Sequence, residues 1–522
     1  MAPENILLTA RRIYTGVWGE QLASAVAVRA GVVSWVGSTS EVGVLDGSWE
    51  RLDLGESVGF PGFVDSHIHL SSYGMRLEEV DLEGCPSLDA ALELVERAVA
   101  CRRKGQWITG GGWNPNEWGG FPHKSPLDRV APDNPVALES KDGHALWCNS
   151  VALRAAGIDE GTPEPPGGVI QRDAAGHLTG VLFEGALEKV RAAMGSADVR
   201  RVAEALERAQ SQLLSLGLTG VHNCEGPEAL HALQLMRERG LLRLRVHMMV
   251  PERNLDAAVR LGLRSGLGDD QLWIGQLKVF ADGALGSGTA YMLHPYEGTD
   301  ERGIAIHSSE ELDDIVRRAN AAGLGVAMHA IGDAANRLAL RAFEAARDLR
   351  GPRNRIEHAQ LLTPEDIAKF AELDVIASMQ PIHAPSDRYM ADRKWGERCR
   401  YAYAWRSLLD SGATLSFGSD APVESPDPII GLYSAVERKR WDEPDSRPWY
   451  PQERLSMREA VEAYTLGAAR AAGKESILGT LEVGKLADLT FFSRDLLECS
   501  AEELKEVRVT HTVIGGSLVF QA

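Results

Sequence analysis

Eight short apolar stretches dominate the middle of the chain, and each is followed by a loop and usually by an amphipathic segment. Apolar and β-branched residues that run together between glycine-containing turns are typical of strands, and longer amphipathic segments are typical of helices. The predicted strands are residues 63–69, 220–223, 245–250, 274–282, 325–329, 355–358, 375–380 and 414–419. This eightfold alternation predicts an α/β fold, a TIM-like (β/α)8 barrel.

Both ends of the chain carry short apolar runs that lack a helical period. These runs lie at residues 6–8, 24–29, 32–36, 487–492, 509–514 and 518–520. Strands at both ends favour one small β-sandwich domain assembled from the two termini. The predicted boundaries are residues 1–57 and 475–522 for this domain and residues 58–474 for the barrel.

One long insertion, residues 71–197, separates the first predicted strand from the second. It contains a Gly/Trp-rich tract, GGGWNPNEWGG, and the segment KDGHALWCNS. A tract of this length with such clusters is expected to form a lid or pocket wall. Large apolar faces beside a polar imidazole suit substrate binding, and ordinary packing is the alternative. The candidate substrate-binding residues are Trp113, His144 and Trp147 in the insertion and Gln380 and His383 after the seventh strand.

The acidic composition narrows the classes of partner. A net charge of −19 disfavours binding to nucleic acid or to an anionic membrane through the bulk electrostatic field. The six cysteines are widely spaced, which is typical of reduced thiols. No signal peptide and no apolar run of the ~20 residues that a membrane span needs are evident, so we expect a cytoplasmic location. We expect a small-molecule substrate as the partner, and a homodimer is left open.

Metal-ligating residue types gather at the ends of the predicted strands. His67 and His69 are two residues apart, so both imidazoles leave the same face of the first strand. A His-x-His pair also occurs on ordinary half-buried strands. However, strands four, five, six and eight end near Lys278, His329, His358 and Asp420. Active sites of such barrels lie at the C-terminal ends of the strands, so these side chains are expected to meet at one rim.

These residue types suit hydrolysis assisted by a metal ion. Imidazole and carboxylate groups bind Zn²⁺ and its neighbours, and a bound metal lowers the pKa of water towards ~7. Asp420 can ligate the metal or carry a proton from the water to a leaving amine. Lys278 has two interpretations, namely an ion pair with Asp282 on the same strand face, or a carbamate whose oxygens bridge two metals.

The pattern as a whole resembles the amidohydrolase superfamily. The specific motifs are similar to the YtcJ-like branch, amidohydrolase family 3, which includes N-substituted formamide deformylases. They are KVFADGALGS (278–287), HAIGD (329–333), RIEHA (355–359), SMQP (378–381) and GSDAPV (418–423), together with GGGW (110–113) and DGHALWCNS (142–150).

The resemblance covers essentially the whole chain and implies roles for the strand-end residues. It places His67 and His69 on one metal, His329 and His358 on a second, Lys278 between them as a carboxylated lysine, and Asp420 as the acid/base. The implied cofactor is zinc, as one or two ions.

Three functional classes remain after the sequence is considered. The first is a metal-dependent hydrolase of a non-peptide C–N bond in an amide, formamide or cyclic amide. The second keeps the site but acts as an ester or lactone hydrolase or as a deaminase. The third is a non-catalytic binding protein, which the complete ligand set disfavours because a relic site is expected to lose a ligand. The substrate itself is not named by these residues.

Overall fold

The computed structural model describes residues 5–19, 22–45, 47–82, 84–115, 118–140, 145–165, 168–195, 199–349 and 351–522. The predicted pocket residue His144 lies outside these ranges. The chain divides into two compact units, one formed by Met1–Tyr73 with Leu206–Ala522 and the other by Gly74–Ala205. Helices α1 (Leu70–Arg76) and α6 (Val199–Ser215) each contain residues of both units.

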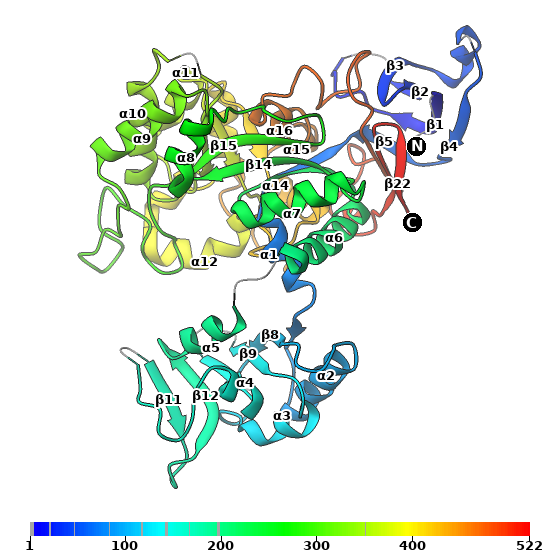
Figure 1. Ribbon diagram of the computed structural model, residues 1–522. Helices are drawn as coiled ribbons and strands as arrows, with labels where there is room; N and C mark the ends of the chain where they lie inside the picture. The colour runs from blue at the N-terminus through cyan, green and yellow to red at the C-terminus, as the bar shows by residue number, and fades with distance from the viewer. Residues whose placement is uncertain are drawn as a thin grey trace. The chain divides into compact units, whose positions relative to one another are not determined.

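The larger unit contains the predicted barrel (Figure 1). Its eight strands are hydrogen-bonded in the order β19-β18-β17-β16-β15-β14-β13-β6, and each neighbouring pair in this order is parallel. They are β6 (Phe63–Ile68), β13 (Leu218–Asn223), β14 (Arg245–Pro251), β15 (Leu272–Phe280), β16 (Val326–Ala330), β17 (Arg355–His358), β18 (Ile376–Met379) and β19 (Leu415–Phe417). The predicted barrel and all eight of its strands are confirmed.

Backbone bonds beyond the strand ends join the first and last strands. Asp420 donates its N–H to the His67 carbonyl at 2.7 Å, and His69 donates to the Ala421 carbonyl at 2.9 Å. These bonds draw the loop after β19 onto the end of β6. Residues far apart in the sequence therefore meet at the C-terminal rim of the barrel.

Helices follow most of the barrel strands and cover their outer faces, as Figure 1 shows for α9 and α10. They are α7 (Pro227–Glu238), α8 (Leu255–Leu261), α9 (Ser309–Ala321), α10 (Asp333–Ala345), α11 (Pro364–Glu372), α12 (His383–Trp395), α13 (Trp405–Asp410), α14 (Pro428–Glu437), α15 (Met457–Tyr464) and α16 (Leu466–Ala471). Local sequence determines where several of these helices begin. Ser308 caps α9 in a capping box with Glu311, and Thr363 caps α11 ahead of Pro364.

Strands from both chain ends form one eight-stranded sheet in the same unit. Its members are β1 (Asn5–Ile13), β2 (Ala23–Arg29), β3 (Val32–Gly37), β4 (Glu50–Asp53), β5 (Val58–Pro61), β20 (Leu489–Phe492), β21 (Val509–Ile514) and β22 (Ser517–Gln521). The antiparallel pairing of β5 with β20 joins the two termini. The expected β domain from both ends is therefore present, with a core that includes Ile13, Val26 and Leu489.

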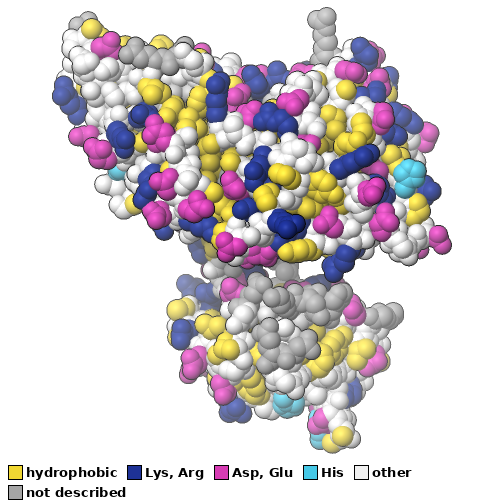
Figure 2. Space-filling view, turned by 180° about the vertical axis from the view of Figure 1, so that it is seen from behind, with side chains coloured by type: hydrophobic (Ala, Val, Ile, Leu, Met, Phe, Trp, Pro, Cys, Tyr) yellow, Lys and Arg dark blue, Asp and Glu magenta, His cyan; other side chains and the backbone are white. Residues whose placement is uncertain are grey.

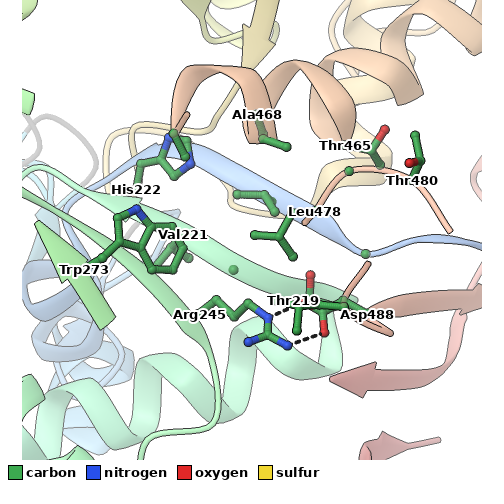
Figure 3. A pocket seen from close by; sticks show the side chains of 17 residues that line it. Thr219, Val221, His222, Arg245, Trp273, Thr465, Ala468, Leu478, Thr480 and Asp488 are labelled. Atoms are coloured by element: carbon green, nitrogen blue, oxygen red, sulfur yellow. Dashed lines mark hydrogen bonds and ion pairs between the residues drawn. The ribbon is translucent and has the colours of Figure 1, made fainter. Parts of the chain in front are cut away.

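A buried ion pair ties this sheet region to the barrel. Arg245 on β14 donates through Nη2 to Oδ1 of Asp488 at 2.8 Å and through Nε to Oδ2, as the dashed lines in Figure 3 show. Asp488 also accepts the Gly515 N–H at 2.8 Å. A bidentate pair with this extra donor is well satisfied, so it fixes geometry at the N-terminal end of the barrel.

The second unit has its own six-stranded sheet, in the order β11-β12-β10-β9-β8-β7. The strands are β7 (Val80–Asp81), β8 (Ile108–Trp113), β9 (Val136–Ser140), β10 (Ala145–Cys148), β11 (Gly168–Arg172) and β12 (Leu178–Glu184), and the helices are α2 (Leu88–Ala100), α3 (Lys124–Val130), α4 (Ser150–Ala155) and α5 (Leu187–Met194). The insertion is thus a folded unit. Its proposed action as a lid stays a prediction.

Two predicted pocket residues, Trp113 and Trp147, lie in the core of this second unit. Both indoles are 0% exposed. Their Nε1–H groups donate to the carbonyls of Leu138 at 2.8 Å and His123 at 3.1 Å. This is the packing role that the sequence left as the alternative. The expectation that they line a substrate pocket is not supported by their burial, because a fully covered ring with a satisfied N–H offers a ligand no surface.

The remaining elements are short. They are α17 (Ala501–Leu504) and the 3-10 turns Thr39–Val44, Glu252–Asn254, Gly396–Tyr401 and Pro451–Glu453. Within the described ranges, no helix is both long and apolar enough to cross a bilayer. All six cysteines are free thiols. On the face that Figure 2 shows, acidic and basic side chains are interspersed over the larger unit.

Candidate metal centre

The strand ends converge on a cavity of about 340 Å³ at the C-terminal rim of the barrel. All six predicted ligand residues line it: His67, His69, Lys278, His329, His358 and Asp420. His383, expected as a substrate contact, also lines it. The remaining wall is largely apolar and includes Phe280, Leu285, Ile331 and Val423. A mainly apolar cleft with a few converging polar groups is typical of an enzyme site.

His67, His69 and Asp420 form the tightest cluster in this cavity. The Asp420 Oδ1 atom lies 3.4 Å from His67 Nε2 and 3.3 Å from His69 Nε2. One ligand atom from each of the three lies within 4.8 Å of the others. Three such atoms around one point, two nitrogen and one oxygen, match the donor set that Zn²⁺ uses in catalytic sites.

A second cluster shares the same carboxylate. His358, His383 and Asp420 also have ligand atoms within 4.8 Å of one another, with His383 Nε2 at 3.9 Å from Asp420 Oδ2. His383 Nε2 is buried and has no hydrogen-bond partner among the described residues. The sequence analysis assigned His383 to substrate binding, and the structure adds it to the candidate metal ligands. Its place just after the seventh strand was the signal, since the other candidate ligands lie at equivalent points.

Gln380 lies behind the site and does not line the cavity. Its Oε1 atom accepts a hydrogen bond from His358 Nδ1 at 2.8 Å. This bond fixes the His358 tautomer and leaves Nε2 free towards the cavity. Its predicted contact with substrate is therefore replaced in the structure by support of an imidazole.

His67 is supported in the same manner by a residue that the sequence analysis did not single out. Its Nδ1 donates to Glu357 Oε2 at 2.5 Å, and Glu357 accepts a second bond from Arg355 Nε at 2.5 Å. Arg355 also donates to His222 Nδ1 at 2.8 Å and to Ser378 Oγ at 2.7 Å. Arg355 and Glu357 are both 0% exposed. The RIEHA motif contains both residues, and their spacing of two places them on the same side of β17 as each other.

Lys278 and His329 also line the cavity, and His329 belongs to neither of the two clusters. The Lys278 amine is buried, has no hydrogen-bond partner in the described part of the chain, and lies 5.0 Å from the Phe280 ring centroid. The alternative ion pair with Asp282 is not formed. Asp282 instead accepts backbone N–H groups of the loop after β16 and of a neighbouring loop, from Tyr291, Ile331 and Gly332.

His329 lies beside His358, with ring centroids 4.5 Å apart. Its Nε2 atom donates to the Gly283 carbonyl at 3.0 Å. The second metal site that the resemblance implies, with His329 and Lys278, stays a prediction.

The backbone holds two of the candidate ligands in an uncommon conformation. His358 has φ 71° and Asp420 has φ 63°, in the left-handed region that residues other than glycine rarely adopt. Such strain persists only where the surrounding structure imposes it, and it concentrates at active sites. At Asp420 the imposed contact is the N–H bond to the His67 carbonyl.

Burial favours the neutral form of His67, His329 and His358, which is the form that binds metal. It lowers the pKa of His67 to about 4 and that of His329 to about 3. It also lowers the pKa of His358 well below its ordinary value. For Asp420, burial alone would raise the pKa, but a hydrogen bond from His69 and the neighbouring His67 outweigh it and lower the pKa. Neutral imidazoles around an ionised carboxylate are ready to receive a cation.

A small second cavity of about 20 Å³ lies at the opposite, N-terminal end of the barrel (Figure 3). Its lining includes His222, Trp273 and the Arg245–Asp488 pair. A volume of this size has room for about one water molecule. None of the candidate metal ligands lines it, so the chemistry belongs to the C-terminal rim.

Comparison with known proteins agrees with this arrangement. A model of the amidohydrolase family (Amidohydro_3) matches residues 50–520. The chain belongs to amidohydrolase family 3.

Several relatives of this amidohydrolase match along nearly their full length. The YtcJ protein of Bacillus subtilis (strain 168) is 35% identical over 98% of both chains. The N-substituted formamide deformylase of Arthrobacter pascens is 30% identical over 96% of this chain and 95% of its own. Among solved structures, an uncharacterized metal-dependent hydrolase from Pyrococcus horikoshii OT3 is 31% identical, with a TM-score of 0.81 over 95% of this chain and 99% of its own.

Proposed function

We propose that this amidohydrolase uses a bound metal, zinc as one or two ions, to hydrolyse a non-peptide carbon–nitrogen bond in an amide, formamide or cyclic amide. The observation that carries the proposal is the cluster of His67, His69 and Asp420 in a cavity that the other candidate ligands and several apolar side chains also line. The 30% identity to an N-substituted formamide deformylase supports the choice of bond.

The residues fit the metal on three counts. Two imidazoles have their Nδ1 atoms bonded, to Glu357 and to Gln380, so their Nε2 atoms are free. His383 Nε2 and the Lys278 amine are buried without partners among the described residues, as expected of groups that a ligand would satisfy. The donors are imidazole and carboxylate, the set that first-row divalent ions prefer.

When bound, the metal would polarise the scissile carbonyl and lower the pKa of the attacking water. Asp420 then has the two proton transfers to perform. It accepts a proton as the oxygen of the water bonds to the carbonyl carbon, and it returns that proton to the nitrogen as the C–N bond breaks. The products are a carboxylic acid and an amine, so the atoms and the proton balance. The lowered pKa of Asp420 keeps its carboxylate ionised before the water attacks.

Lys278 is proposed to carry a carbamate when the metal is present. The amine has no ion-pair partner in the described structure, and Asp282 is occupied by backbone donors. A carbamate formed from this amine and CO₂ would add two oxygen ligands beside His67, whose pKa the Lys278 charge helps to lower. Formation of the carbamate releases a proton and replaces the buried, uncompensated amine with an anionic group, whose charge a bound metal cation would balance.

The test is a hydrolysis screen of N-formyl, N-acyl and cyclic amides, with esters, lactones and aminated heterocycles as the competing classes. The zinc-loaded protein, the chelated protein and the Asp420→Asn variant are compared, with exposed His231→Gln as a matched control. Amide turnover that requires both metal and Asp420 is expected. Turnover confined to esters or to ring amines would show that the enzyme cleaves one of those bonds and not the proposed amide bond. Turnover unaffected by Asp420→Asn would refute the proposed proton transfers.

A further inference from the structure

One face of α12 forms a wall of the metal cavity. His383, Asp387 and Met390 all line it. Their spacing of four and then three residues places them on the same side of the helix. His383 lies at the metal end, beside Asp420. Asp387 is therefore about one helical turn, roughly 6 Å, from the cluster.

Asp387 is the one carboxylate lining this cavity, within the described residues, that belongs to neither metal cluster. Its side chain is half-buried. The Oδ2 atom accepts a hydrogen bond from the Tyr403 hydroxyl at 2.5 Å. No hydrogen bond or ion pair to Oδ1 is found in the part of the chain that the structure describes. One oxygen is thus held by the protein while the other remains available.

Tyr403, whose hydroxyl binds Asp387, is itself held by several contacts. Tyr403 is 1% exposed, with a backbone φ of 51°. Its N–H donates to the Gln360 carbonyl at 2.7 Å, and its carbonyl accepts from Arg438 Nη1 at 2.9 Å. The Arg438 guanidinium lies 4.5 Å from the Trp405 ring centroid. These contacts fix the direction of the hydroxyl, so the carboxylate is held in one orientation at the cavity wall.

A carboxylate in this position is unfavourable unless a cation pairs with it. Burial raises its pKa, and this effect outweighs the opposing effects of His383 one turn away and of the Tyr403 hydrogen bond. Several other residues that line the cavity are apolar, including Met390, Ile331 and Val423. Desolvation destabilises the charged form, and an opposite charge within ~4–6 Å restores it. Lys278 is the other fixed charge on the wall apart from Asp420, but it lies on β15, directly beside the metal cluster. A cationic group of a bound substrate would supply the opposite charge that Asp387 lacks.

We propose that Asp387 selects amides whose remote substituent carries a positively charged nitrogen, an ammonium or guanidinium group, about one helical turn from the scissile carbonyl. This inference rests on the proposed amide hydrolysis for its catalytic readout, although the binding that it describes can be measured without turnover.

The experiment compares two formamides of matched shape. N-(4-aminobutyl)formamide carries an ammonium group, and N-pentylformamide has a methyl group in its place. Each is tested with the zinc-loaded wild type, with Asp387→Asn and Asp387→Ser, and with Glu372→Gln, which changes an exposed carboxylate on α11. Wild type and Glu372→Gln should favour the cationic compound. Both Asp387 variants should lose roughly 10- to 100-fold of that preference in kcat/KM, with zinc content unchanged.

Binding separates this inference from the proposed reaction. Calorimetric titration of the same two formamides is performed on the Asp420→Asn background, with and without Asp387→Asn. Tighter binding of the cationic compound that Asp387→Asn abolishes supports the inference even if no formamide is hydrolysed. Equal binding of the two compounds, or a preference that survives both Asp387 changes, overturns it.

Discussion

Glu357→Gln offers a sharp test of how the barrel interior supports the metal centre. Glu357 is fully buried and accepts bonds from both His67 Nδ1 and Arg355 Nε, each at 2.5 Å. The glutamine keeps the shape but loses the charge, so the His67 ring is held less firmly and its Nε2 is a weaker base. Loss of such an outer partner lowers metal affinity by about 10- to 100-fold.

The same change also disturbs folding, for a different reason. Arg355 is 0% exposed, so its guanidinium would remain buried without the opposing carboxylate. Removing one partner of a buried ion pair destabilises a protein by about 3–5 kcal/mol. A second variant, Glu357→Gln with Arg355→Met, removes both charges. It should recover much of the lost stability, because no unpaired charge remains, but it should not recover the metal affinity.

Two measurements distinguish these effects. Zinc affinity is measured by competition with a chelator of known strength, and unfolding free energy is measured on metal-free protein with denaturant. We expect both variants to bind zinc about 10- to 100-fold more weakly and only the single variant to be strongly destabilised. Wild-type zinc affinity in Glu357→Gln would refute the role given to Glu357. Recovery of affinity together with stability in the double variant would show that the effect on zinc came from unfolding.

Three further predictions concern the cavity itself. Asp420→Asn should lower turnover on whichever amide the screen identifies by at least about 10²-fold, with the fold intact and most metal retained; near-normal turnover would remove Asp420 from the mechanism. Lys278→Ala should lower bound metal and activity, and short carboxylic acids should partly restore both; full metal content and rate would mean that no carbamate is needed. Burial lowers the pKa of His67 to about 4, so its neutral, metal-binding form should persist as the pH falls below 6.5. The zinc content measured after dialysis should therefore fall only near pH 4 to 5. Loss of zinc centred at pH 6.5 would show that the imidazole titrates as if exposed.

Much of the barrel could be predicted because its signal is local. A strand such as Arg245–Pro251 is a run of apolar residues bounded by turns, and α9 begins at a capping box, Ser308 with Glu311. These patterns depend on neighbours a few residues apart. The rim position of His67, His69 and Asp420 also followed from the sequence, since the barrel brings all strand ends to one edge.

The insertion shows where local signals failed. Trp113 and Trp147 have the composition of pocket residues, yet both are fully buried and bonded to backbone carbonyls. A large aromatic residue suits a core and a binding site equally well. Only the pairing of β8, β9 and β10 in one sheet decides which face each ring occupies, and that pairing depends on contacts distant in the sequence.

The sequence by itself therefore determined the eight strands, the joining of the two ends in one β domain and most of the candidate ligands. The tertiary structure decided which side chains meet: His383 enters a cluster with His358 and Asp420, whereas His329 lies outside it. It also placed Glu357 behind His67 and Asp387 on the cavity wall. The physical reason is that a strand's period fixes the face of a side chain, but the distance between side chains of different strands depends on twist, on register and on the left-handed backbone at His358 and Asp420.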